Sequence, residues 1–200
     1  MRYRWTLVAV VVAALIAVGG VAMAWQRNTG PPSAGPISPG SPRPSSSTPT
    51  SPSPNPRSSA EQESADRAAV EQAWQTFWTV RDAVESGTVP QSQWPAVVGA
   101  VAVDPTYTRL ISAATQFRKS ALRAYGAVMF HPYWSQPIAG KPIAVMGDCM
   151  DTSQHGSLYV TTGDKRSVGV ARDNTRATFV RGTDDRWRVK LIETLVDQKC

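Results

Sequence analysis

A stretch rich in proline and serine divides this chain and limits where a folded domain can form. Residues 28–60 hold 10 of the chain's 16 prolines, and most of their other residues are Ser, Thr or Gly. Such a segment cannot bury enough apolar surface to offset the entropy that ordering costs. Proline also favours the extended polyproline II conformation. We therefore predict a disordered linker over residues 28–60 and a folded domain over residues 61–200.

An uncharged apolar run precedes this linker. It covers residues 5–26, which are 22 residues, and about 20 apolar residues are needed to cross a bilayer as a helix. Arg2 and Arg4 come before the run, and positive charge beside a membrane segment tends to stay in the cytoplasm. We therefore predict that residues 1–27 form a cytoplasmic stub and a single-pass transmembrane anchor in the cell membrane, which leaves the C-terminal domain extracytoplasmic.

The end of the apolar run also fits a cleaved signal peptide. Ala22-Met23-Ala24 matches the small-x-small pattern at which signal peptidases cut. Cleavage after Ala24 would release the rest of the chain as a secreted protein. Both interpretations export the domain, and both remain open at this stage.

The net charge of +6 does not indicate a nucleic-acid-binding protein. Five of the 21 Lys and Arg residues precede residue 61, whereas all 15 acidic residues lie at position 61 or later. The domain therefore carries 16 basic and 15 acidic side chains. It has no dense basic stripe of the kind that binds phosphate backbones, so we expect no nucleic-acid partner.

Helical periodicity fills the first half of the domain. Ser58 is a candidate helix cap, and Gly87 is a natural stop. Between them, apolar residues recur at spacings of three and four: Val70, Ala73, Trp74, Phe77, Val80 and Val84. We predict a second helix over residues 93–103. A third opens at Asp104-Pro105, continues through Ala121 and Tyr125, and ends at Gly126.

The second half of the domain alternates between polar and apolar residues, as strands do. We predict strands over residues 128–134, 143–150, 157–161, 174–181 and 186–195. Alternation in the last two predicts an antiparallel hairpin with one buried face, formed by Thr178, Val180, Trp187, Val189 and Leu191. Helices followed by strands indicate an α+β fold.

Four local features carry a resemblance to a known family: Trp74-Gln75-Thr76-Phe77, Asp104-Pro105, Asp148-Cys149-x-Asp151 and Trp187-x-Val189. Together with the stub, apolar segment and linker, they resemble small actinobacterial envelope proteins with a nuclear transport factor 2-like (cystatin-like) domain, such as the Mce-associated membrane proteins and the periplasmic scaffold subunits of type IV secretion systems. The resemblance covers residues 61–200. It implies three helices packed on a curved antiparallel sheet that together form a cone, and homodimers that can form through the open sheet face.

The resemblance leaves three kinds of function open, because this fold hosts scaffolds, carriers and enzymes. Our leading hypothesis is a non-catalytic, membrane-tethered accessory or scaffold module that binds other cell-envelope proteins. The second is a carrier or sensor of a small apolar ligand held in the cone. The third is a SnoaL-like hydrolase or isomerase, with His131 or Asp148 as its base. We expect no cofactor.

The aromatic residues supply the candidates for a ligand pocket in such a cone. They are Trp74, Trp78, Tyr107, Tyr125, Trp134 and Trp187, with His131 among them. Apolar pockets lined by aromatic side chains are typical of small-molecule sites. Aromatic residues at helical spacing are also typical of an ordinary hydrophobic core.

The two cysteines, Cys149 and Cys200, are most simply explained as a disulfide. An exported domain lies in an oxidising compartment, where paired cysteines form disulfides. A metal site is less well supported, because zinc sites usually pair Cys or His at short spacing. A nucleophilic Cys149 helped by His155 remains conceivable, although Asp148 and Asp151 would disfavour its thiolate.

Overall fold

A computed structural model describes residues 58–196, 198 and 200. The predicted anchor over residues 5–26 and nearly all of the predicted linker lie outside these residues. Among the helices of the described part, none combines the length and the apolar character that crossing a bilayer requires.

The first helix, α1 (Ser59–Glu85), is the longest element of the domain. Its N-terminus is closed by a capping box, in which the Ser58 hydroxyl accepts from the Glu61 amide and the Glu61 carboxylate accepts from the Ser58 amide. These bonds satisfy two of the amide groups that a helix start leaves unpaired. The chain turns after the helix at Gly87, whose φ of 80° suits glycine. The predicted start and stop of this helix are confirmed.

Two shorter helices follow a single 3₁₀ turn at Gln91–Gln93. They are α2 (Trp94–Val101) and α3 (Thr106–Lys119). The Asp104 carboxylate accepts from the Thr108 amide and hydroxyl, at 3.2 and 2.6 Å, and so caps the start of α3. The prediction that this third helix continues to Tyr125 is wrong. The chain leaves the helix at Ala121, whose φ of 49° is left-handed, and Tyr125 lies in a strand.

The strands form two sheets, and every pair of adjacent strands in them is antiparallel. The larger sheet has the order β2-β3-β6-β7, and the smaller has the order β1-β4-β5. The larger sheet contains β2 (Pro132–Tyr133), β3 (Ile143–Met150), β6 (Asp173–Arg181) and β7 (Trp187–Thr194). The smaller sheet contains β1 (Leu122–Tyr125), β4 (Gly156–Tyr159) and β5 (Lys165–Val168). The α+β class is confirmed, with three α-helices and antiparallel strands in the described part of the chain.

The division into two sheets was not predicted. Strand β1 falls within the predicted third helix, and the sequence does not predict β5, because all four of its residues are exposed and show no alternation. Strand β2 is also shorter than the predicted 128–134, since Met129 forms only an isolated bridge with Asp151.

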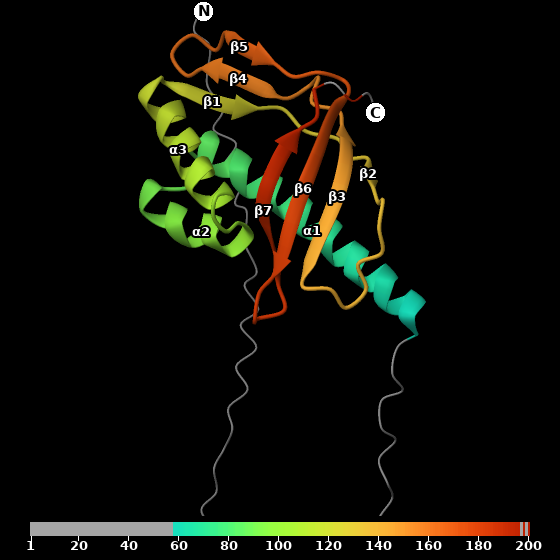
Figure 1. The fold of residues 1–200 in the computed structure, drawn as a ribbon. Helices are drawn as coiled ribbons and strands as arrows, with labels where there is room; N and C mark the ends of the chain where they lie inside the picture. The colour runs from blue at the N-terminus through green and yellow to red at the C-terminus, as the bar shows by residue number, and fades with distance from the viewer. Residues whose placement is uncertain (1–57, 197, 199) are drawn as a thin grey trace, which may run out of the picture. The chain divides into compact units, whose positions relative to one another are not determined.

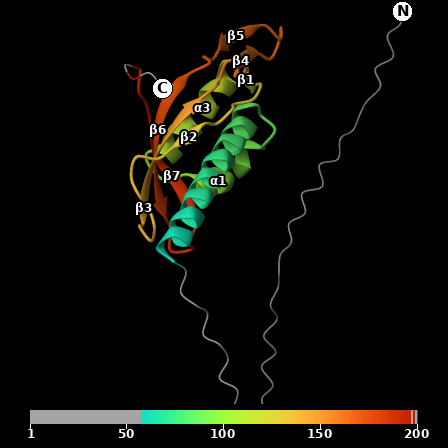
Figure 2. The same ribbon diagram turned by 90° about the vertical axis from the view of Figure 1, so that its right-hand side faces the viewer.

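The helices leave one face of the larger sheet open. Helix α1 crosses behind the strands, and α2 and α3 pack beside it near β7 (Figures 1 and 2). Between α1 and the sheet, aromatic rings fill the core. The Trp74 ring stacks on Phe77 at 5.6 Å between centroids and meets Trp78 and Phe179 edge to face at 5.7 and 6.0 Å.

The predicted buried face of the β6–β7 hairpin is wrong for β6 and for Leu191 of β7. Trp187 and Val189 are buried as expected, but β6 buries Ala177 and Phe179, whereas Thr178 and Val180 lie on the opposite face. In β6 the pairing of Phe179 with Val189 places the odd-numbered residues on the buried face. In β7 the register shift leaves Lys190 without a partner, as a bulge that moves Leu191 to the open face. One extra residue in a strand moves its later side chains to the other face.

Candidate functional site

The open face of the larger sheet carries a group of outward-facing apolar side chains. Strand register places Ile143 opposite Val180, and Val145 opposite Thr178, which in turn pairs with Leu191. We call these five residues, four of which are apolar, the apolar platform. Ile143 and Val145 keep 51% and 41% of their surface exposed. Neighbouring exposed apolar residues of this kind are typical of interaction surfaces.

A charged pair lies beside the platform on the same face. Arg176 of β6 and Glu193 of β7 are opposite each other, and the guanidinium donates from Nε and Nη2 to the two carboxylate oxygens at 3.1 and 3.3 Å. The Glu193 carboxylate raises the pKa of Arg176. Arg188 of β7 is likewise paired, with Asp184. The charged groups of this face therefore largely neutralise one another.

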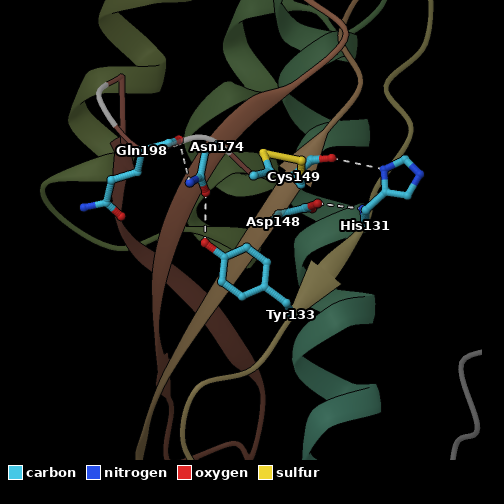
Figure 3. Close-up of a disulfide and its surroundings, with 7 residues drawn as sticks. His131, Tyr133, Asp148, Cys149, Asn174 and Gln198 are labelled. Carbon is cyan, nitrogen blue, oxygen red and sulfur yellow. Dashed lines mark hydrogen bonds between the residues drawn. A yellow bond between two sulfur atoms is a disulfide. The ribbon is translucent and has the colours of Figure 1, made fainter.

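Tyr133 of β2 lies on the same face of the larger sheet, where it pairs with Gly147 of β3. Gly147 in turn pairs with Arg176 of β6. The Tyr133 ring packs directly over Gly147, where the Cβ of any other residue would collide with the ring. Its hydroxyl donates to Asn174 Oδ1 at 2.9 Å, and Asn174 Nδ2 donates to the Gln198 carbonyl at 2.9 Å (Figure 3). These bonds hold the C-terminal segment against β6.

Beyond Tyr133, the disulfide Cys149–Cys200 joins β3 to the end of the chain (Figure 3). The predicted pairing is confirmed, and neither cysteine is a free thiol. A pocket of about 670 Å³ lies beside the sulfur atoms, which we call the disulfide pocket. It is lined by His131, Tyr133, Cys149, Asp151, Ala171, Arg172, Asn174, Gln198 and Cys200. Its volume falls within the range usual for ligand pockets, roughly 300–1,000 Å³.

The residues around Cys149 point in different directions. Asp148 faces the core and is 1% exposed. The Trp74 indole and the His131 backbone amide each donate to one of its carboxylate oxygens, both at 2.7 Å. Burial raises the pKa of Asp148, and these two hydrogen bonds oppose the rise. The carboxylate thus ties β3 to α1 and to the segment before β2.

Asp151 and His155, which the sequence analysis also considered beside Cys149, have local roles as well. Asp151 accepts from the Ser153 amide at 2.9 Å and shapes the turn after β3, and the hydrogen bonds from Ser153 hold the pKa of Asp151 below its usual value. His155 is buried and its Nε2 lies 2.9 Å from Asp82 of α1. With Cys149 in a disulfide, the hypothesis of a nucleophilic cysteine helped by His155 is wrong for this state.

The seven aromatic and histidine residues predicted for a pocket do not surround one cavity. Trp74, Trp78 and Trp187 are core residues, 1%, 6% and 6% exposed. Tyr107 and Trp134 pack at the edge of that core, and Tyr125 lies in the smaller sheet.

His131 alone among these seven lines the disulfide pocket. Its ring Nδ1 lies 3.1 Å from the Cys149 carbonyl, so the ring does not face the carboxylate of Asp148 (Figure 3). Tyr133, Arg172 and Asn174 were missed as pocket residues. Gly147 within an apolar strand was the signal available for Tyr133, because an isolated glycine in a strand marks a close approach.

Within the described residues, Cys, His, Asp and Glu do not gather into a group of three or more that could hold a metal ion. The sites that do form there offer hydrogen-bonding groups, apolar side chains and a disulfide, which are suited to binding.

Comparisons with known proteins give no family for this chain. No family model matches it, and no curated protein matches it either. Among solved structures, the intermembrane space region of the chloroplast protein ARC6 is similar, with 10% identity and a TM-score of 0.43 over 63% of this chain and 93% of that one. A structure from Catenulispora acidiphila is similar with 13% identity and a TM-score of 0.40, over 67% of this chain and 94% of that one.

Proposed function

We propose that this protein is a non-catalytic, membrane-tethered extracytoplasmic module that binds another cell-envelope protein through the open face of its larger sheet. The anchor and linker come from the sequence, in which an uncharged run of 22 residues precedes a proline-rich segment. The nuclear transport factor 2-like cone and the relation to Mce-associated membrane proteins are part of the same proposal. A disulfide suits this location, because disulfides persist in oxidising compartments.

The observation that carries the proposal is the apolar platform on a sheet face that no helix of the described residues covers. Ile143 and Val145 keep 51% and 41% of their surface exposed, and contiguous exposed apolar residues of this kind are typical of interaction sites. The platform continues past Tyr133 into the disulfide pocket, so one partner could cover the face and insert a side chain into the pocket. Two ion pairs, Arg176–Glu193 and Arg188–Asp184, leave the face nearly neutral. A partner surface that is apolar and uncharged fits it best.

Site-specific photo-crosslinking in the native envelope tests this proposal. In one variant a photoreactive residue replaces Val145 on the platform. In a second variant it replaces Lys165, an exposed residue of β5. We expect one crosslinked envelope protein from position 145 and none in common from position 165. Ile143→Asp should abolish the crosslink.

Val160→Asp is the matched control, since Val160 is 56% exposed and lies outside the platform. This control should keep the crosslink, and both variants should keep the thermal unfolding midpoint of the parent. A crosslink only to a second copy of this chain would show instead that the sheet face forms a homodimer. The absence of any reproducible product from position 145 would also refute the proposal.

A further inference from the structure

A groove lies along the edge of the larger sheet, on the side where α1 passes (Figure 2). Its volume is about 590 Å³, within the range of roughly 300–1,000 Å³ that is usual for ligand sites. One wall is the chain segment just before β2, residues 126–130. The other wall is a stripe of α1 formed by Gln75, Trp78, Thr79 and Asp82, whose spacing of three and four places them on one helix face. We call this cavity the edge groove.

Contacts join the two walls at one end of the groove and in its middle. Asp82 Oδ1 of α1 lies 2.9 Å from His155 Nε2, and the Cα of His155 would lie 3.1 Å from a Cβ added at Gly126. Further along, the rings of Trp78 and Phe130 are 6.4 Å apart between centroids. The α1 stripe and residues 126–130 therefore run side by side and face each other across the edge groove.

The segment before β2 turns one pair of backbone groups away from the sheet. The Met129 amide donates to the Asp151 carbonyl at 3.0 Å, and the Met129 carbonyl accepts from the Asp151 amide at 2.9 Å. Both peptide bonds of Met129 are trans, and a planar trans peptide directs its C=O and its N–H to opposite sides. The Val128 carbonyl and the Phe130 amide therefore point away from Asp151 and from the strands of the sheet.

These two outward groups form an open strand edge. Val128 and Phe130 both line the groove and are only partly buried, and neither forms a backbone hydrogen bond with any other described residue. Unpaired N–H and C=O groups on a sheet edge are a template for another strand. Peptides that add to such an edge gain affinity from main-chain hydrogen bonds. The edge groove therefore offers an extended peptide one carbonyl and one amide with which to pair.

The helical wall carries an accessible acid. Asp82 keeps 33% of its side chain exposed, and its Oδ2 has no partner among the described residues. Arg81, its neighbour in sequence, is engaged elsewhere, since its guanidinium pairs with Glu85 and lies 4.3 Å from the centre of the Trp78 ring. A lysine or arginine side chain of a bound peptide can therefore reach this carboxylate and pair with it.

Two residues limit the length of the segment that can pair. Gly126 has a φ of 85°, so the chain leaves the extended conformation there. Pro132 has no amide to donate. Strand addition is therefore confined to residues 127–131, and the peptide that pairs with them is about five residues long.

We propose that the edge groove binds a short extended segment of a partner protein by strand addition, with its backbone on Val128 and Phe130 and a Lys or Arg side chain on Asp82. The groove shares no lining residue with the disulfide pocket. This site does not depend on the function proposed for the open sheet face.

Fluorescence anisotropy with the full-length protein at pH 7 tests the proposal. The probe is the labelled peptide Lys-Val-Thr-Val-Lys, which places a lysine near Asp82 whether it pairs parallel or antiparallel. We expect saturable binding of this peptide and none of Glu-Val-Thr-Val-Glu. Methylation of the backbone nitrogens tests the strand pairing itself, because only alternate residues of a strand bond to one neighbour. Methylating either the odd-numbered or the even-numbered residues of the peptide should abolish binding, and methylating the other set should preserve it.

Variants of the helical wall test the role of the acid. Asp82→Asn should weaken the peptide by roughly fivefold, as expected for one partly exposed ion pair. Asp164→Asn, which changes an exposed acid outside the groove, should leave the affinity unchanged. Thr79→Arg provides a second variant in case Asp82→Asn does not fold, since Thr79 is exposed and an arginine there fills the groove and repels the lysines. It should abolish binding while the thermal unfolding midpoint stays near that of the parent.

Absence of saturable binding to the parent protein would overturn the proposal. So would equal effects of the two methylation patterns, or unchanged affinity in both Asp82→Asn and Thr79→Arg. A second copy of this chain is the other candidate occupant of the edge. Slow hydrogen exchange of the Phe130 amide in a dimer without peptide would show that such a copy already pairs there, and would also overturn the proposal.

Discussion

Asp148 shows how a single buried carboxylate can tie several elements of a domain together. Each of its oxygens accepts one hydrogen bond, from the Trp74 indole and from the His131 amide. Asp148→Asn keeps the shape but places an amide NH₂ against one of these donors. A buried donor left without an acceptor costs about 1–3 kcal/mol. We expect the variant to lose stability of that order in denaturant unfolding at pH 7.

Asp151→Asn is the control for this prediction, because Asp151 accepts from Ser153 through one oxygen that the amide retains. It should change the free energy of unfolding little. If Asp148→Asn were as stable as the parent, relief from burying a charge would outweigh the lost hydrogen bond, and the proposed tie between β3 and α1 would be unimportant.

Glu85 gives a pH-dependent prediction. Burial raises the pKa of its carboxyl above the ordinary value of 4.5, and pairing with Arg81 only partly offsets this. Just above pH 4.5 the Glu85 carboxyl group is ionised in the unfolded chain but still protonated in the folded protein. The stability that Glu85 contributes therefore falls as the pH rises towards and through its folded pKa. Glu85→Gln removes that loss. The variant should gain stability relative to the parent as pH rises from 4 to 7, measured by denaturant unfolding.

At the scale of elements, the contact between β2 and β3 depends on Gly147, because a residue with a side chain would not fit beneath the ring of Tyr133. Gly147→Ala would drive its Cβ into the ring of Tyr133, and forcing extra atoms into a packed contact typically costs about 1–3 kcal/mol. Tyr133→Ala removes the obstacle but also the hydrogen bond to Asn174. We expect the double variant to be more stable than the sum of the two single changes predicts.

A double-mutant cycle in denaturant measures this coupling. Strictly additive losses would mean that Tyr133 simply rotates away when Gly147 gains a side chain. Gly99→Ala is a useful comparison, since the nearest heavy atom to its added Cβ is at an ordinary 3.8 Å, and its effect should be independent of Tyr133.

The elements also differ in how well the sequence predicts them. Helix α1 has a cap at Ser58, a stop at Gly87 and continuous apolar spacing between them, so local signals agree with the fold. Strand β1 has no such support. Ala121 and Tyr125 continue the helical spacing of α3, and only the pairing of β1 with β4, far along the chain, makes residues 122–125 a strand. The bulge at Lys190 of β7 could not be predicted either, because it arises from the fit between two strands.

At the scale of the whole molecule, the Cys149–Cys200 disulfide could be predicted because the sequence indicates an exported domain. The apolar run and the linker favour an oxidising compartment, and two cysteines there are expected to pair. The disulfide pocket could not be foreseen in the same way. Its walls come from the segment before β3, the start of β6 and the last residues of the chain, and their meeting depends on the tertiary fold.

The disulfide should stabilise the domain chiefly through the unfolded state. Cys149 and Cys200 are 51 residues apart in sequence, and closing a loop of that length contributes about 4 kcal/mol in the chain-entropy model. We expect Cys149→Ser, Cys200→Ser and the double variant to lose similar amounts, because each change opens the same loop. Denaturant unfolding of the full-length protein, with and without reductant, measures the loss.

The slope of unfolding against denaturant separates this explanation from a loss of native contacts. An unfolded chain without the disulfide is more expanded and exposes more surface, so the slope should increase. If the disulfide acted only by holding Gln198 against Asn174, removing it would lower the midpoint and leave the slope unchanged. Asn174→Ala with the disulfide intact provides that second case directly, since it breaks the contact and keeps the loop closed.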